Sequence, residues 1–582
     1  MANFFTDNDD IQFLFNHMNL ALVAKLREED FSHAKTFDHA PANAAEAIDN
    51  YRHILSVIGE IAGERVAPTA GETDEVGNKL NADGSVTYAP GIAEAVRLFG
   101  QADAMGFTLP YRFGGLNGPH LLYSMSNDIV SRADASLMNL YGLQGIAETI
   151  NAFATEEIKQ EYLPRMASGE WTGAMVLTEP DAGSDLQAVK VRAFQDPDGQ
   201  WRVRGVKRFI TNGCGEVLLV LARTEPDIAD GRGLSCLLVE RGPRVKVRRL
   251  ENKLGIHGSP TCELFFDDAP AKLIGERRRG LITYVMSLMN GARIGIASQS
   301  LGIGEAAFRV ARDYANSRKQ FNTAIDNFPA VRDLLVEMSL DLQAARALTY
   351  YASYCVDLET GYGTRLKAAD LAADEQKSVR NNERRYKSFN KTLTPMAKYY
   401  GSEMSMRVAN SSMAVLGGSG YMKDYAVERH LRDSRITTIY EGTSQLQVVA
   451  AIAGVMGGQT AEIVADILGE RTWSPELQPL TAKINDGLNI LAEAVAFVKA
   501  HNAANAYRDL YARKLVDIAT DLVIAALFCD HATASDKKLA VARRWLNERI
   551  PRLHMLKEQI YSGDTSTLDD FETLVGPLPK AE

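Results

Sequence analysis

The sequence predicts a mainly α-helical protein with a small central β-domain and an extra helical domain at its C-terminus. Apolar residues recur at helical spacing before residue 169 and again after residue 281. The stretch between them is built of short, β-branched segments separated by Gly, Pro or Asp turns. A chain of 582 residues is also too long for a single hydrophobic core. We therefore expect several domains in the order helices, β-domain, helices, helices.

These changes between helical and β-type residue patterns divide the chain into four segments. They are an N-terminal helical domain with an N-terminal arm at residues 1–168, a middle β-domain at 169–280, a second helical domain at 281–457 and a C-terminal helical extension at 458–582. In the first segment the spacing predicts helices over residues 44–66, 91–105 and 121–129. Residues 71–88 are rich in Gly, Asn and Asp, which predicts a loop.

The β-domain is expected to be antiparallel, with strands at residues 188–193, 201–210, 216–223, 235–239 and 262–267. In the second helical domain the pattern predicts helices over residues 282–314, 329–360, 366–373 and 389–416. The charged run at residues 377–387 is typical of a solvated helix face or a connection. Helices are expected in the extension at residues 480–503, 506–531 and 537–550.

Composition restricts the classes of function. A net charge of −10 argues against a general nucleic-acid binder, which needs a basic face. Five cysteines are scattered without a CxxC pair, which fits a reducing compartment and argues against a disulfide framework or a zinc site. No HExxH pattern, secretory signal or apolar run of about 20 residues is present, so no metal and no membrane span is expected. These features predict a soluble, cytoplasmic protein.

The string IYEGTSQL at residues 439–446 is the most informative in the chain. Glu441 stands between apolar Tyr440 and flexible Gly442, so its carboxylate can be desolvated, which raises its pKa toward that of a working general base. Gly442 lets the backbone pass close to a ligand, while Thr443 and Gln445 offer polar contacts. The alternative is a surface turn with a solvated acid.

Two strings in the β-domain are suited to holding a flat, heteroatom-rich ring. VLTEPDAGSD at residues 176–185 ends an apolar strand in a loop of small residues that can present backbone N–H groups and the hydroxyls of Thr178 and Ser184. KRFITNG at residues 207–213 puts Phe209 and Thr211 on the same face of a strand. Phe209 could then pack on the ring while Thr211 bonds its edge; a core phenylalanine is the alternative.

Two further strings are suited to a phosphate or nucleotide. Arg318 in SRKQF follows a long predicted helix and is a candidate pyrophosphate clamp, although a lone arginine there is usually a surface residue. LGGSGY at residues 416–421 is glycine-rich enough for close backbone approach to a nucleotide. It is not the dinucleotide-binding fingerprint, because no strand and βαβ unit surround it.

Together these strings resemble the acyl-CoA dehydrogenase flavoprotein family over roughly residues 50–455. The resemblance is most specific in VLTEPDAGSD, KRFITNG, SRKQF and LGGSGYMKDYAVERHLRDSRITTIYEGTSQLQ. It implies an acyl-CoA dehydrogenase-like fold with FAD held where the β-domain meets the second helical domain. The extra C-terminal segment is similar to that of the larger family members.

The resemblance also implies roles for individual residues. Thr178 and Thr211 would bond the isoalloxazine beside Phe209, with Ser184 near the flavin and the thioester. The implied FAD contacts further include Met175, Leu177, Arg318, Gln320, Phe321, Gly417, Gly418, Thr443 and Gln445. Arg318, Gln320 and the Gly417-Gly418 loop would reach the FAD of a neighbouring subunit, which implies a homodimer or homotetramer. The implied acyl-CoA contacts are Ser184, Arg293, Tyr440 and Gly442.

The sequence departs from the family at two positions. Ala414 stands where the family often has Gln before the VLGG string, and Asn322 stands where a glycine usually follows the Arg-x-x-Phe string. A branch of the family takes its catalytic base from the helix that contains residues 290–293. This chain has no acid there, which favours Glu441 as the base.

By that resemblance the reaction is the α,β-dehydrogenation of an acyl-CoA thioester to the trans-2-enoyl-CoA. Glu441 would remove the α-proton while the β-hydride passes to flavin N5. The Glu441 backbone N–H and a flavin ribityl hydroxyl would stabilise the thioester carbonyl. An electron-transfer flavoprotein would then accept the electrons.

The alternatives are an acyl-CoA oxidase that uses oxygen, a non-enzymatic flavoprotein that binds nucleic acid, and a membrane-associated long-chain enzyme anchored by the C-terminal domain. The acyl group is left open.

Overall fold

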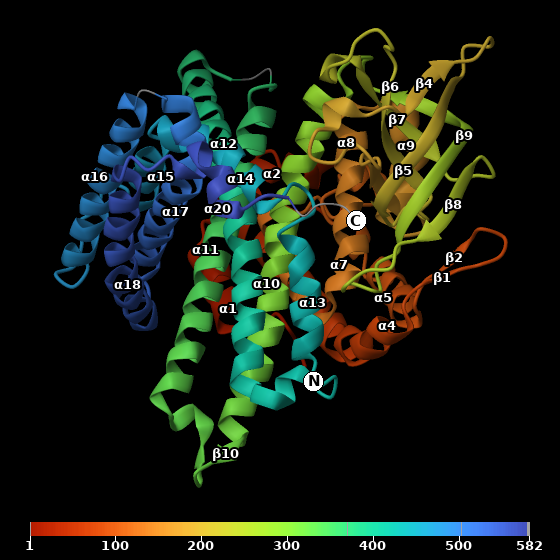
Figure 1. Ribbon diagram of the computed structural model, residues 1–582. Coiled ribbons are helices and arrows are strands. Elements are labelled where there is room, and N and C mark those ends of the chain that lie inside the picture. Colours follow the sequence, from red (N-terminus) through yellow and green to blue (C-terminus); the bar gives the residue numbers. More distant parts are fainter. Residues whose placement is uncertain (1, 369–370, 502, 579–582) are drawn as a thin grey trace. The chain divides into compact units, whose positions relative to one another are not determined.

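A computed structural model describes residues 2–368, 371–501 and 503–578 (Figure 1). The chain folds into two compact units. The first comprises residues 1–387 and 397–444, and the second comprises residues 388–396 and 445–582. The predicted division into four segments stays a prediction.

The first unit begins with helices, and the predictions at 44–66, 91–105 and 121–129 are confirmed. The elements are α1 (Asp9–His17), α2 (Leu20–Arg27), α3 (Ala44–Ile61), α4 (Ala70–Val76), α5 (Pro90–Gln101), α6 (His120–Ala133), α7 (Ala135–Tyr141), α8 (Ile146–Phe153) and α9 (Glu156–Ala167). The loop predicted at 71–88 is wrong in part, because α4 and the hairpin β1 (Lys79–Leu80) and β2 (Val86–Thr87) occupy it. The turn of this hairpin contains polar residues, and there Asp83 accepts the Ser85 N–H at 2.9 Å.

The β-domain closes on itself. Its strands are β3 (Gly173–Val176), β4 (Arg192–Gln195), β5 (Trp201–Thr211), β6 (Val217–Arg223), β7 (Leu234–Glu240), β8 (Val245–Leu250) and β9 (Thr261–Ile274). They follow the order β3-β6-β4-β5-β9-β7, with β8 on β9 and a further β6–β7 pairing that joins the sheet. Val203, Leu237 and Leu264 fill one side of the sheet, while Leu219 and Leu238 pack with Ile150 and Leu163 of α8 and α9 on the other.

The apolar strand expected to end at the VLTEPDAGSD string is confirmed as β3. Three other features differ from the expectations: β8 is an additional strand, β4 begins at Arg192 rather than at residue 188, and the β3–β6 and β4–β6 pairings are parallel. β3 is short and mostly buried, so it lacks the alternation that marks a half-exposed strand. β8 is rich in basic residues, which pair with glutamates such as Glu263 on β9.

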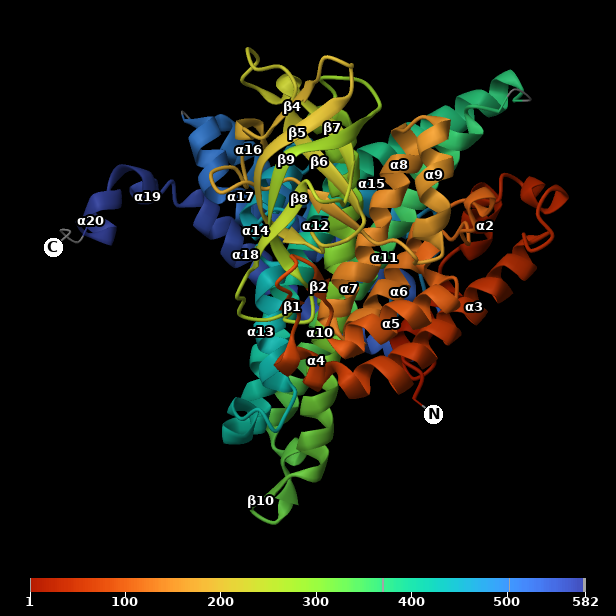
Figure 2. The same cartoon turned by 90° about the vertical axis from the view of Figure 1, so that its right-hand side faces the viewer.

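Long helices form the rest of the first unit. They are α10 (Met286–Ser317), α11 (Pro329–Arg365), α12 (Ala373–Leu416) and α13 (Val427–Thr437). α10 packs against α6, α11 and α13. A hairpin of β10 (Lys319–Gln320) and β11 (Thr323–Ala324) joins α10 to α11 at the far end of both helices (Figures 1 and 2).

The predicted helix at 366–373 is wrong for the described residues. α11 ends at Arg365, Leu366 caps it, and α12 begins only at Ala373; residues 369–370 lie outside the described residues. The charged run at 377–387 belongs to α12 and is largely exposed, as expected for a solvated helix face.

The second unit is helical. Its elements are α14 (Ser444–Met456), α15 (Gln459–Leu468), α16 (Gln478–Ala500), α17 (Ala504–His531), α18 (Asp536–Tyr561) and the short α19 (Ser566–Asp569) and α20 (Phe571–Val575). The three helices predicted in the extension are confirmed, and they pack on one another as α16, α17 and α18. Among the described helices no single one is long and apolar enough to cross a membrane, although the pair α14 and α15, bent by 80°, meets that test together.

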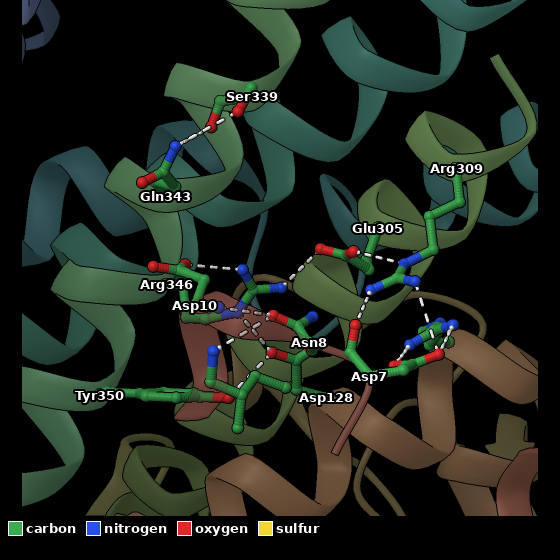
Figure 3. A network of polar contacts seen from close by, with 12 residues as sticks. Asp7, Asn8, Asp10, Asp128, Glu305, Arg309, Ser339, Gln343, Arg346 and Tyr350 are labelled. Carbon is green, nitrogen blue, oxygen red and sulfur yellow. Dashed lines mark hydrogen bonds and ion pairs between the residues drawn. The ribbon is translucent and has the colours of Figure 1, made fainter. Parts of the chain in front are cut away.

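A buried arginine ties the N-terminal arm to the first unit (Figure 3). Arg346 of α11 is 1% exposed and donates to the carboxylates of Asp10 (2.7 Å), Asp128 (3.0 Å) and Glu305 (2.9 Å). Asp10 belongs to α1, whereas Asp128 and Glu305 belong to α6 and α10. The burial of one cation among three carboxylates therefore fixes the arm against the helices that lead to the candidate site.

Candidate active site

Glu441 lies in a strained turn between two helices. α13 ends at Thr437 and α14 begins at Ser444. Glu441 has φ +54° and the following Gly442 has φ +87°. The left-handed conformation is uncommon for a residue with a side chain and costs about 1–3 kcal/mol, so the surroundings must hold it in place. The Ser444 N–H, which bonds the Thr438 carbonyl at 3.0 Å, closes the turn.

Glu441 is half-buried, and its carboxylate faces two cations. Burial raises its pKa from 4.5 to about 7, against the opposing charges of Lys398 on α12 and Arg293 on α10. Burial likewise lowers the pKa of Lys398 to about 7, while Glu441 acts in the opposite direction. A carboxylate that titrates near neutral pH is suited to general-base catalysis. A fully solvated acid, the alternative left open by the sequence, does not fit these surroundings.

Arg293 presents a guanidinium that is only partly bonded within the first unit. Its Nη1 lies 3.3 Å from Asn290 Oδ1. Its Nε is buried and has no hydrogen-bond partner among the described residues. Burial lowers the pKa of Arg293, and the charge of Glu441 opposes that shift. A buried donor without a partner costs about 1–3 kcal/mol, which is consistent with a ligand acceptor at this place.

The hydroxyl of Tyr440 fixes the residue before the acid. It lies 3.1 Å from Asn139 Oδ1 of α7 and also contacts Gln299 Oε1 of α10. The Gln299 amide donates to Asn139 Oδ1 at 3.0 Å and to the Ala135 carbonyl at 2.8 Å. Tyr440 is thus locked between α7 and α10, and burial raises its pKa well above the ordinary range.

The same network leads to the end of β5. Asn139 Nδ2 donates to Ser259 Oγ at 3.3 Å. The neighbouring Pro260 carbonyl accepts the Asn212 N–H at 2.7 Å, directly after Thr211. Hydrogen bonds therefore connect the strand end that carries Phe209 and Thr211 with the turn that carries Glu441.

A buried ion pair braces the loop at residues 178–185. Lys207 is fully buried, and its Nζ lies 2.9 Å from Glu179 Oε1 and 2.7 Å from the Leu177 carbonyl. Glu179 also accepts the backbone N–H groups of Lys190 and Val191 at 2.7 and 2.9 Å. Because Glu179 is held inward, half-buried Thr178 and exposed Ser184 are presented on a fixed loop.

Phe209 is not a core residue. It is 52% exposed, has φ +61° and stacks against the Arg208 guanidinium at 4.6 Å. The pairing of β5 with β9 is irregular between Lys207 and Ile210, and such a bulge changes the direction of the strand. Ile210 is buried between exposed Phe209 and half-buried Thr211. The Phe209 ring is therefore accessible to a ligand at the end of β5, and the Thr211 side chain is partly accessible.

The remaining residues near this surface differ in exposure. Met175 of β3 and Thr443 are half-buried. The Leu177 side chain is buried in an apolar cluster with Leu281 and Val285, so only its backbone is available to a ligand. Gln445 is in the first turn of α14 and belongs to the second unit.

A second group of predicted residues lies at the other end of the long helices. Arg318, Gln320 and Phe321 are exposed at the β10–β11 hairpin, Phe321 to 90%. The Gly417-Gly418 loop lies at the same end, because Tyr314 contacts both Ser419 (3.3 Å) and Tyr425. Along α10 the distance from Gln299 to Arg318 is about 28 Å at the helical rise of 1.5 Å per residue. Within one chain the two groups are therefore separate.

Lys398, Asn139 and Gln299 are site residues that lie outside the informative strings of the sequence. Lys207 and Glu179 lie inside two of those strings, but their sequence neighbours do not indicate that they form a buried pair. A buried lysine needs a partner. Its partners here are backbone carbonyls or distant acids, which a sequence pattern cannot pair with it.

Family models match nearly the whole chain. The N-terminal, middle and C-terminal domains of acyl-CoA dehydrogenases match residues 49–170, 174–269 and 279–456. A fourth model, described as acyl-CoA dehydrogenase C terminal, matches residues 457–543.

Individual relatives agree with these matches. An acyl-CoA dehydrogenase described as short-chain specific, from Clostridium acetobutylicum, is 33% identical over 68% of this chain and 94% of its own length. The structure of butyryl-CoA dehydrogenase from Megasphaera elsdenii aligns with a TM-score of 0.59 and 28% identity over 70% of this chain and 98% of that one.

A third comparison reaches into the C-terminal extension. The structure of an acyl-CoA dehydrogenase complexed with FAD from Bacillus anthracis aligns with a TM-score of 0.74 over 91% of this chain and 92% of that one, at 22% identity, which shows likeness of fold alone. The sequence matches and the shared fold together show that this chain belongs to the acyl-CoA dehydrogenase family of FAD-dependent oxidoreductases.

Proposed function

We propose that this protein oxidises an acyl-CoA thioester to the 2-enoyl-CoA, with Glu441 as the base that removes the α-proton. The observation that carries the proposal is the desolvated Glu441 carboxylate, whose pKa of about 7 suits proton transfer at neutral pH. No other acid lies in residues 290–293, the alternative place for a base in the family.

The residues present fit FAD. An exposed Phe209 ring next to Thr211 gives a surface on which a flat ring can lie. The braced loop at 178–185 adds backbone N–H groups and two hydroxyls. At the other end of the helices a Cβ built on Gly417 or Gly418 would meet nothing within 4 Å, which leaves room for close backbone approach. Thr178, Phe209, Thr211 and Thr443 would hold the flavin end.

In the proposed reaction the chain supplies the base, the polarising donor and the exclusion of water. Glu441 accepts the α-proton on its carboxylate, and the electron pair left on the α-carbon forms the new double bond. The Glu441 backbone N–H would donate to the thioester carbonyl and stabilise the enolate charge. FAD, when bound, accepts the β-hydride. The charges of Arg293 and Lys398 oppose the rise in the pKa of the carboxylate that burial causes.

Purified protein is expected to be yellow with about one FAD per chain, and an acyl-CoA substrate is expected to bleach it without oxygen. Anaerobic titration with a panel of short, branched, long, aromatic and dicarboxylic acyl-CoA thioesters tests this and identifies the acyl group. A correctly folded, colourless protein that cannot be reconstituted with FAD would contradict the proposal. We propose an electron-transfer flavoprotein as the acceptor; stoichiometric peroxide under air would instead identify an oxidase.

We also propose that the FAD site is shared between subunits of a homodimer or homotetramer. Arg318 and the Gly417-Gly418 loop are exposed and lie about 28 Å along α10 from Gln299, so a second copy would have to present them to the flavin surface. In a two-fold symmetric pair each copy would present these residues to the flavin surface of the other, which is an isologous contact.

Arg318→Ala is therefore expected to weaken FAD retention by about tenfold or more, the typical loss of one charge-assisted contact of 1.5–3 kcal/mol. Arg312→Ala, which removes an exposed arginine of α10 that pairs with Asp326, is the matched control and should retain FAD. FAD release on dilution measures FAD retention, and light scattering measures the oligomeric state. A monomer that keeps its FAD would refute the shared site.

A further inference from the structure

A buried lysine ties together the two sides of the turn that carries Glu441. Lys398 of α12 is 0% exposed. Its Nζ donates to the carbonyl of Thr437 at 2.7 Å and to the carbonyl of Gly442 at 2.7 Å. Thr437 is the last residue of α13, and Gly442 directly follows the acid. One ammonium group therefore spans the turn from its first residue to the residue after Glu441.

We propose that Lys398 is the positioning residue of the base: it holds the turn in the conformation that aims the Glu441 carboxylate, and its positive charge, when present, favours the ionised form of that carboxylate. The inference rests on the proposed function, because it concerns the same glutamate. It assigns the bracing and the electrostatic control of the base to one side chain outside the turn.

The local structure explains why a lysine can be buried here. The last carbonyls of a helix have no intrahelical partner, and the C-terminal end of the helix carries partial negative charge. The Thr437 carbonyl at the end of α13 is such a group, and it also accepts the Ser402 hydroxyl at 2.8 Å. Two carbonyls, the helix end and a nearby carboxylate offset the desolvation of the ammonium.

The backbone of the turn requires such bracing. Glu441 and Gly442 have consecutive positive φ values of +54° and +87°. A non-glycine residue keeps this conformation only when its surroundings over-determine it. The Lys398 bonds hold the residues on both sides of Glu441, while the turn itself contributes the Ser444 to Thr438 bond. Loss of Lys398 should therefore loosen the carboxylate more than the fold.

The charges around Lys398 predict the sign of the electrostatic effect. The groups that face it are Glu441 from the turn, Arg293 from α10 and Glu403 from its own helix. Burial raises the pKa of Glu441, and the charges of Lys398 and Arg293 oppose this rise. Removing the lysine charge takes away one of these opposing charges, so the pKa of Glu441 should rise further. The base is then protonated, and inactive, up to a higher pH.

The test compares the FAD-loaded wild type with three variants. Lys398→Met removes both the charge and the donors, Lys398→Gln keeps two N–H donors without the charge, and Ser402→Ala removes the neutral donor on the Thr437 carbonyl. The second-order rate of anaerobic flavin bleaching by the best acyl-CoA is measured from pH 5.5 to 9. FAD content and the melting temperature check that each variant is folded.

Both Lys398 variants should shift the acid limb of this profile upward by about one pH unit or more, as expected for losing an opposite charge within about 4–6 Å. Ser402→Ala should leave the limb in place. Lys398→Met should also lower the plateau rate more than Lys398→Gln and speed amide hydrogen exchange at residues 438–443. A purely structural role would reduce the plateau of all variants without moving the limb, and that result would overturn the proposal.

The outcomes separate this inference from the proposed function. If no acyl-CoA bleaches the wild type, the proposed function fails. If the wild type is bleached and the limb of either folded Lys398 variant stays at the wild-type pH, only the role of Lys398 fails. If neither variant folds, exchange in the wild type decides: protection at 438–443 supports the bracing, whereas exchange as fast as in the exposed β10–β11 hairpin overturns it.

Discussion

Glu441→Gln is expected to lower the rate of anaerobic flavin bleaching by at least ~10²-fold, the lower end of the effect of losing a general base. Glutamine preserves the size of the side chain and much of its hydrogen bonding, so FAD and acyl-CoA should still bind. The chain offers no second acid in residues 290–293 that could replace it. Stopped-flow absorbance at saturating acyl-CoA measures the bleaching step itself.

Two further variants make this result specific. Glu441→Asp should keep partial activity, because a shorter carboxylate is displaced from the α-carbon but can still accept a proton. Glu462→Gln, which neutralises an exposed acid on α15, should bleach at the wild-type rate. If Glu441→Gln is bleached nearly as fast as the wild type, the base is another residue.

Arg346→Met is expected to be the most destabilising single change in the first unit, by about 3–5 kcal/mol, the usual cost of breaking a buried ion pair. Asp128 and Glu305 are both buried and would lose their shared counter-charge. Arg309→Met is the control, because Arg309 is partly exposed and Glu305 would keep its ion pair with Arg346. It should cost at most about 1 kcal/mol. Melting temperatures at one scan rate give the comparison.

The deficit of Arg346→Met should also depend on pH. Without the arginine, burial raises the pKa values of the remaining carboxyls above those of the unfolded chain, which are about 4. The folded state then binds more protons than the unfolded state, so stability is lost as the pH rises through that range. The deficit should be larger at pH 8 than at pH 5. An equal deficit at both values would mean that lost packing, rather than charge, is responsible.

The fold could be predicted from the sequence wherever one pattern dominated. Long amphipathic stretches gave α3, α10, α11 and the helices of the second unit, because a helix that buries one face needs apolar residues at a fixed spacing. β8 could not be predicted in this way, because it is lined with arginines that pair across the sheet with glutamates of β9. Its identity as a strand depends on partners outside its own segment.

Some residues of the candidate site could be identified from their sequence neighbours, and others could not. Glu441 could be singled out because its neighbours in sequence are an apolar tyrosine and a glycine, and Phe209 and Thr211 because they stand two residues apart at a strand end. The positive φ of Phe209 and of Glu441 was not expected from the sequence. Lys398, Asn139 and Gln299 could not, because what makes them important is a contact with Gly442 or Tyr440 that only folding creates. Residues that hold a catalytic group from another helix have no local pattern.

The pH dependence of bleaching in the unaltered protein tests most directly whether the desolvated Glu441 is the base. Its carboxylate must be ionised to accept the α-proton, and burial raises its pKa from 4.5 to about 7. The second-order bleaching rate should therefore fall below about pH 7, by about tenfold for each further pH unit. A rate that stays constant down to pH 5.5 would mean that the base has an ordinary carboxyl pKa or is not a carboxylate in these surroundings, and would contradict the proposed site.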